Sequence, residues 1–69
     1  MTQNDKILNH LKEYGSITPR SAYDRYGIMR LGARIYDLRQ EGFQIEKVME
    51  STKNRFGEDV TYARYYYHP

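Results

Sequence analysis

The side chains of this chain that are best suited to chemistry are arginines, and they are concentrated in its middle third. Residues 18–40 carry five arginines, two aspartates and no lysine, which gives this segment a net charge of +3. The other residues carry six basic and seven acidic side chains, so their net charge is −1. Arginine can donate two parallel hydrogen bonds to a phosphate or to the edge of a guanine, a geometry that lysine does not offer. This asymmetry favours a surface that binds nucleic acid.

Catalytic and metal-binding chemistry has little support in the sequence. The chain has no cysteine, and its two histidines, His10 and His68, lie near opposite ends and lack the spacing of a zinc site. No serine stands in a nucleophile motif, and there is no glycine-rich phosphate loop. We therefore expect a protein that is not an enzyme and that has no cofactor and no metal.

The length of the chain predicts one small domain over residues 1–69. No run of about 18 apolar residues is present, so we expect no segment that crosses a membrane. The first ten residues lack a basic region followed by an apolar run, which argues against a signal peptide. These features together predict a cytoplasmic protein.

The pattern of residues 3–14 predicts a helix. Thr2 is suited to cap its start, Asp5 lies in the first turn, where a negative charge suits the helix dipole, and Gly15 is suited to end it. The apolar side chains fall on one face at helical spacing, and they are Ile7, Leu8, Leu11 and Tyr14.

A second, shorter helix is predicted over residues 19–26, after an extended link formed by Ser16 and Ile17. Thr18 caps it, Pro19 fits its first position because the missing N–H is not needed there, and Gly27 ends it. Its inward stripe is predicted to be Ala22, Tyr23 and Tyr26.

The third helix, over residues 30–41, has the clearest periodicity. Leu31, Ile35 and Leu38 form a single apolar stripe, and Gly42 stops the helix. Gly32 lowers helix propensity by about 1 kcal/mol relative to alanine. Two interpretations of Gly32 stay open, which are close packing against the second helix and close approach to a DNA backbone.

After Gly42 the apolar pattern changes to a period of two residues, which predicts a hairpin. A first strand begins at residue 43, a polar loop covers residues 51–59, and a second strand covers residues 60–67. Arg64 is the residue least suited to a core, so the opposite face of the second strand should point inward, with Ala63, Tyr65 and Tyr67. Tyr62 and Tyr66 should then form an exposed patch on the outer face.

This order of elements is that of a winged helix-turn-helix, an α+β fold of three helices followed by a two-stranded wing. The helix-turn-helix covers residues 18–41 and the wing covers residues 43–67. In such a fold the third helix lies in the major groove of DNA. The residues expected to be buried are Leu8, Leu11, Ala22, Leu31, Ile35, Leu38 and Ile45.

Two stretches carry a resemblance to a known family. The segment ITPRSAYDRYGIMRLGARIYDLRQEGFQI and the later VTYARYYY resemble the small winged helix-turn-helix domain proteins of phages and mobile elements of Gram-positive bacteria. The shared pattern is TP, a Tyr-Gly-Ile turn, an ARIYDLR-type helix, a glycine and a YARY-type strand. The resemblance implies DNA binding through residues 30–40 and the wing. This chain departs from the pattern by closing the last strand with a run of tyrosines.

Three groups of residues are candidates for DNA contact. On the third helix, Arg30, Ala33, Arg34, Asp37 and Gln40 lie off the apolar stripe. At the start of the second helix, the candidates are Thr18, Arg20 and Ser21, and at the wing tip they are Lys53, Asn54 and Arg55. Simpler interpretations compete with these roles: Thr18 as a helix cap, Arg34 paired with Asp37 or bracing another carboxylate, and a solvated wing tip. Glu50, Glu58 and Asp59 should weaken the positive field of that tip.

The sequence therefore predicts a protein that binds double-stranded DNA, as a transcriptional regulator or as an architectural or excision accessory factor. The expected partners are DNA and either a second copy of the chain in a weak homodimer or a host protein. The alternative is a protein-interaction module that binds and inhibits a host protein, for which the Tyr62 and Tyr66 patch would serve.

Overall fold

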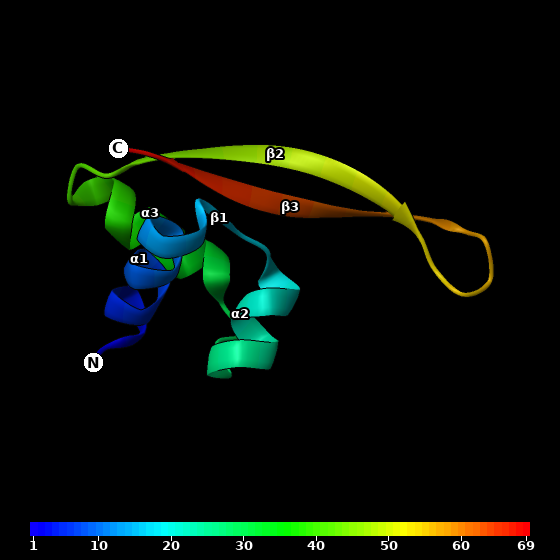
Figure 1. Cartoon of the computed structure of the whole chain (residues 1–69), viewed down its shortest axis with the longest axis horizontal. Coiled ribbons are helices and arrows are strands. Elements are labelled where there is room, and N and C mark those ends of the chain that lie inside the picture. Colours follow the sequence, from blue (N-terminus) through cyan, green and yellow to red (C-terminus); the bar gives the residue numbers. More distant parts are fainter.

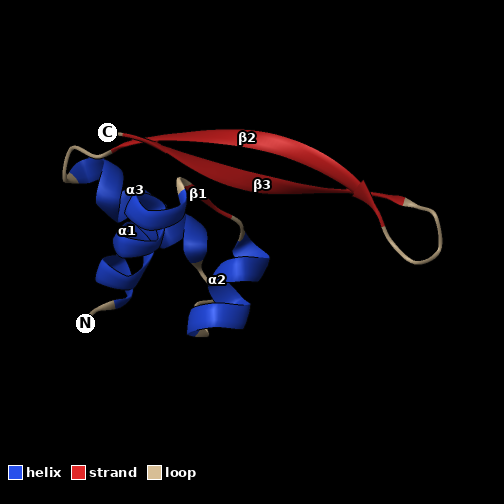
Figure 2. Cartoon of the chain, viewed as in Figure 1, coloured by secondary structure: helices blue, strands red, loops and turns tan.

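The computed structural model of the chain describes residues 1–69 and contains three helices and three strands (Figure 1, Figure 2). In chain order the elements are α1 (Gln3–Tyr14), β1 (Ser16–Ile17), α2 (Pro19–Tyr26), α3 (Leu31–Gln40), β2 (Gln44–Lys53) and β3 (Asp59–His68). The predicted α+β class and the order of three helices followed by a hairpin are confirmed. None of the helices has the length and apolar character needed to cross a membrane.

The three strands form one antiparallel sheet in the order β1-β3-β2. β2 and β3 pair along their whole length, from Gln44 opposite His68 to Lys53 opposite Asp59. The predicted extended link is β1, which pairs with the far end of β3 through Ser16 opposite Tyr66. The hairpin runs past the helices, and its tip projects well beyond them (Figure 1), which gives a molecule of 39 × 22 × 20 Å.

The hairpin is longer than predicted, because the loop assigned to residues 51–59 is in fact the turn 54–58. β2 continues to Lys53, and β3 begins at Asp59. Ser51 and Thr52 show no apolar alternation and are exposed, and they stay in the strand through backbone pairing with Thr61 and Val60. A backbone ladder needs no buried side chain, so the pattern of side chains could not reveal this extension.

The core lies between the helices and the inner face of the sheet. Its members are Ile7, Leu11, Ile17, Ala22, Ile28, Leu31, Ile35, Leu38, Ile45 and Tyr65. The predicted inward face of β3 is confirmed, since Tyr65 is buried and both Ala63 and Tyr67 pack against the core. Leu8 was predicted to be buried but is only half-buried. It lies at the edge of the face of α1 that presents Ile7 and Leu11 to the core.

Of the three tyrosines predicted to line the inner faces of α1 and α2, Tyr26 packs against the core as predicted, and the other two do not. Tyr14 is 54% exposed and Tyr23 is 57% exposed, so their predicted inward placement is wrong. α2 has two turns and buries only Ala22 of its own residues. Ile17 and Ile28, which flank α2, are each 1% exposed and fill the space instead.

The predicted helix ends are confirmed by their caps. Thr2 and Asp5 form a reciprocal capping box at the start of α1, which also lowers the pKa of Asp5 through hydrogen bonds from Thr2. Gly15 and Gly27 end α1 and α2 in the left-handed region, with φ of 86° and 67°. α3 is one residue shorter than predicted at each end, because its first and last predicted residues are the N-cap and C-cap.

Gly32 does not pack against α2, so that interpretation is wrong. The atom nearest to the position of a Cβ at Gly32 is Oη of Tyr65 on β3, at 3.9 Å. No atom of α2 comes within 4 Å of that position. Gly32 is thus exposed and lies beside the end of the Tyr65 side chain.

His10 is a buried titratable group between α1 and α2. It is 6% exposed, and its Nδ1 lies 2.7 Å from the hydroxyl of Tyr26. Burial, reinforced by the charge of Arg25, lowers the pKa of His10 below the ordinary value of 6.5. The unfolded chain therefore binds more protons than the folded chain when the pH falls below that ordinary value.

We expect the free energy of unfolding to decrease as the pH falls below about 6.5, the unperturbed histidine pKa. The measurement is urea unfolding of the parent, His10→Gln and His68→Gln between about pH 7.5 and 5.5, on either side of that pKa. The parent and His68→Gln should lose stability over this interval, while His10→Gln should lose much less. A loss that disappears in His68→Gln but persists in His10→Gln would contradict the assignment.

Candidate nucleic-acid interface

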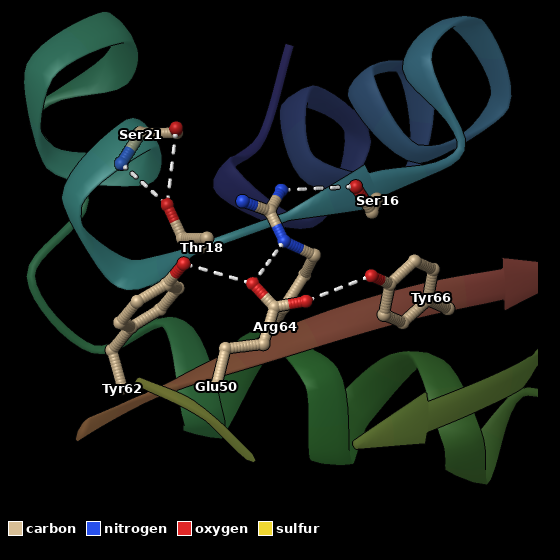
Figure 3. Close-up of polar contacts among 7 residues, drawn as sticks. All are labelled: Ser16, Thr18, Ser21, Glu50, Tyr62, Arg64 and Tyr66. Carbon is tan, nitrogen blue, oxygen red and sulfur yellow. Dashed lines mark hydrogen bonds and ion pairs between the residues drawn. The ribbon is translucent and has the colours of Figure 1, made fainter. Parts of the chain in front are cut away.

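The start of α2 presents one of its three candidate side chains to solvent. Thr18 is 7% exposed, and its hydroxyl oxygen accepts a hydrogen bond from the Ser21 backbone N–H at 3.2 Å (Figure 3). The same hydroxyl donates to Oγ of Ser21 at 3.1 Å. Thr18 is thus a helix cap, as the simpler interpretation held. The side chain of Arg20 is 91% exposed, with only a 3.5 Å contact to Asp24.

The five candidates on α3 do not form one free surface. Arg34 lies 3.2 Å from Asp37, and its Nη1 donates to Oε1 of Gln3 at 3.1 Å. Asn4 donates to Asp37 at 3.3 Å, so both charged residues lie against the start of α1. The simpler interpretation of an Arg34 and Asp37 pair thus describes their contacts. The remaining candidates differ in exposure: Arg30 and Gln40 are exposed and Ala33 is half-buried.

The most exposed row of residues on α3 lies on a different side of the helix from the predicted row. Gly32, Tyr36 and Gln40, spaced four residues apart, are all exposed, and Tyr36 is 62% exposed. Tyr36 was not among the predicted site residues, although its position opposite the Leu31 stripe was a usable signal. Arg39 is held to the sheet, because its Nε and Nη2 both donate to the carbonyl of Ile45 at 3.1 and 2.9 Å.

The wing tip combines an ordered turn with one free cation. The side-chain oxygen of Asn54 accepts hydrogen bonds from the backbone N–H groups of Phe56 and Glu58, so this candidate shapes the turn. Lys53 is paired with Asp59 at 2.8 Å. Arg55 is exposed and forms no ion pair, and the neighbouring Phe56, which sequence reasoning missed, is 78% exposed.

The geometry is that of three helices, an exposed face on the third, and a hairpin that projects beside them. A family model described as winged helix-turn-helix domain matches residues 2–67. The chain belongs to the winged helix-turn-helix domain family. Such domains are typically noncatalytic modules that bind DNA. Neither the curated proteins nor the solved structures gave a match to this chain.

The outer face of this winged helix carries a hydrogen-bonded cluster centred on Glu50 (Figure 3). One carboxylate oxygen of Glu50 accepts from Nε of Arg64 at 2.9 Å and from the hydroxyl of Tyr62 at 2.8 Å. The other accepts from the hydroxyl of Tyr66 at 2.9 Å. Arg64 also donates to Ser16 at 3.2 Å, which ties the wing to β1.

This cluster corrects two expectations about the winged helix. The guanidinium of Arg64, aided by the two hydroxyls, lowers the pKa of Glu50. The charge of Glu50 was expected to weaken the positive field of the wing tip, but it is paired with Arg64. Tyr62 and Tyr66 are half-buried with both hydroxyls engaged, so they do not form the exposed patch that was predicted. The hydrogen bond to Glu50 also raises the pKa of Tyr66.

Proposed function

We propose that this winged helix binds double-stranded DNA, with α3 in the major groove and the β2–β3 hairpin on the flanking backbone. The observation that carries the proposal is a pair of exposed arginines that form no ion pair, one beside the exposed face of α3 and one at the wing tip. Arg30 lies at the start of α3, and Arg55 lies at the wing tip. Exposed cations of this kind attract phosphates and release counterions when they bind.

The role that fits such a module is transcriptional control or an architectural function such as assistance in excision. Origin in a phage or mobile element of Gram-positive bacteria is part of the proposal and is supported by the resemblance of residues 17–45 and 60–67. Because few cations on α3 and the wing are unpaired, one copy should bind weakly. A second copy on an adjacent site would raise the affinity through effective concentration.

The proposal is tested by titrating the chain with short mixed-sequence duplexes over a range of salt concentrations. Fluorescence anisotropy should show an affinity that falls steeply with salt, with a slope of about 0.9 per phosphate neutralised. If no duplex is bound at low salt, the proposal is wrong. A stable complex with a protein from a host lysate in that case would support the protein-interaction role instead.

A further inference from the structure

The start of α3 differs from the starts of the other two helices in lacking a cap. The side chain of its N-cap residue, Arg30, makes no hydrogen bond to the first turn. As at the start of most helices, the first two backbone N–H groups, those of Leu31 and Gly32, have no acceptor within the chain. The first turn of α3 therefore presents unsatisfied donors, and the helix dipole adds a partial positive charge at the same place.

Tyr65 supplies a second, independent feature beside this turn. Its side chain reaches from β3 so that Oη lies 3.9 Å from the position of a Cβ at Gly32. The residue is 8% exposed, yet its hydroxyl forms no hydrogen bond within the chain. That hydroxyl is not among the fully enclosed polar atoms without a partner, so solvent reaches it. The hydroxyls of Tyr62 and Tyr66, in contrast, are both bonded to Glu50.

Gly32 itself is not required by the fold. Its φ is not among the positive values, and a Cβ would make only an ordinary van der Waals contact at 3.9 Å. Glycine is the least favourable residue after proline in a helix, so alanine would suit this position better on local grounds. What glycine provides is open space in front of the Tyr65 hydroxyl and the free N–H groups.

We propose that the first turn of α3, together with Tyr65 and Arg30, is a subsite for one phosphate of the DNA backbone. The phosphate oxygens would accept hydrogen bonds from the N–H groups of Leu31 and Gly32 and from the hydroxyl of Tyr65, with the charge of Arg30 nearby. Such a contact carries no sequence information but sets the register of α3 in the groove. The inference rests on the proposed DNA binding and specifies where that binding is anchored.

The test compares the parent with Tyr65→Phe, Gly32→Ala and Tyr67→Phe in salt titrations of a short mixed-sequence duplex. Tyr65→Phe removes only a hydroxyl without a partner in the chain, so its thermal midpoint should match that of the parent. Its affinity should fall about tenfold at every salt concentration, the usual effect of losing a hydrogen bond to a charged group. The salt slope should not change, because no charge is removed.

The thermal midpoint of Gly32→Ala should equal or exceed that of the parent, because alanine favours the helix. Its affinity for the duplex should still be about tenfold weaker, because the methyl group occupies the subsite. Tyr67→Phe is the matched control, since Tyr67 lies on the same face of β3 and packs against Phe43 instead of the start of α3. It should bind like the parent. On titration of the parent with duplex, the amide resonances of Leu31 and Gly32 should be among those that shift most.

The outcomes separate the subsite from the function. If the parent binds duplex with salt dependence and both Tyr65→Phe and Gly32→Ala bind equally well, the subsite is wrong and DNA binding stands. If Tyr67→Phe weakens binding as much as Tyr65→Phe, the effect is not local and the subsite is also wrong. If the parent binds no duplex at any salt concentration, the proposed function fails, and the subsite fails with it.

Discussion

Replacement of Leu38 by alanine should leave the chain largely unfolded at room temperature. Leu38 is 2% exposed in the last turn of α3, and its carbonyl accepts from the backbone N–H of Phe43 at the entry to the wing. Loss of a buried leucine side chain costs about 2–5 kcal/mol, from lost transfer energy and the cavity that is left. The core of a chain this short rarely supplies more than about 3–5 kcal/mol of stability, so little of it would remain.

Far-UV circular dichroism and urea unfolding would measure this loss. Leu38→Met conserves most of the volume and should cost less than about 1.5 kcal/mol. Met49→Ala removes a side chain that is 58% exposed on the wing and should change stability little. If Leu38→Ala unfolds cooperatively at the urea midpoint of the parent, Leu38 does not contribute to the core as expected.

The double substitution of Arg30 and Arg55 by alanine should cause the largest loss of DNA binding. Each side chain is exposed and forms no ion pair, so removal should not unfold the chain. If each arginine contacts one phosphate, the salt slope should fall by about two units, and binding should weaken on all sequences alike. If Arg30 also reads a base edge, its replacement alone should relax sequence preference at one position.

The measurement is a salt titration of both a selected target and a random duplex. Lys12→Ala is the control, and it removes one positive charge where the double variant removes two. Lys12 lies on α1, with its Nζ 5.8 Å from the centre of the Phe43 ring. It should reduce the slope by much less. An unchanged slope in the folded Arg30 and Arg55 variant would mean that DNA lies on another face. Circular dichroism must show that each variant is folded, since a marginal domain can lose binding by melting.

The predicted site residues differ in the partners that they find within the chain. Arg30 and Arg55 are exposed and form no ion pair, which agrees with their predicted positions off the apolar stripe of α3 and at the wing tip. Lys53 and Asn54 are engaged by residues at most six positions away in the same hairpin, which a local analysis of the hairpin could have found. Arg34 and Asp37 are engaged partly by Gln3 and Asn4, more than thirty positions away, and no local pattern shows that.

The order of the elements and the ends of α1 and α2 could be predicted from local sequence signals. Helix caps and terminal glycines interact only with residues a few positions away, so they can be recognised from the sequence alone. This applies to the caps at Thr2 and Thr18 and to the left-handed glycines at 15 and 27. The stripe of Leu31, Ile35 and Leu38 likewise needs only the helical period. These local signals were sufficient to predict a winged helix-turn-helix.

The covered flank of α3 and the hydrogen-bond partners of the remaining polar side chains depend on how distant elements pack together. A helical stripe defines the direction of the core, but it does not say whether α1 or the sheet lies beside each flank. The packing of α1 covers Arg34 and Asp37, and the register of β3 brings Tyr65 to Gly32. The Glu50 cluster depends in the same way on pairing between strands 12 to 16 residues apart in sequence. Such contacts arise from the crossing of distant segments, which the local spacing of residues does not encode.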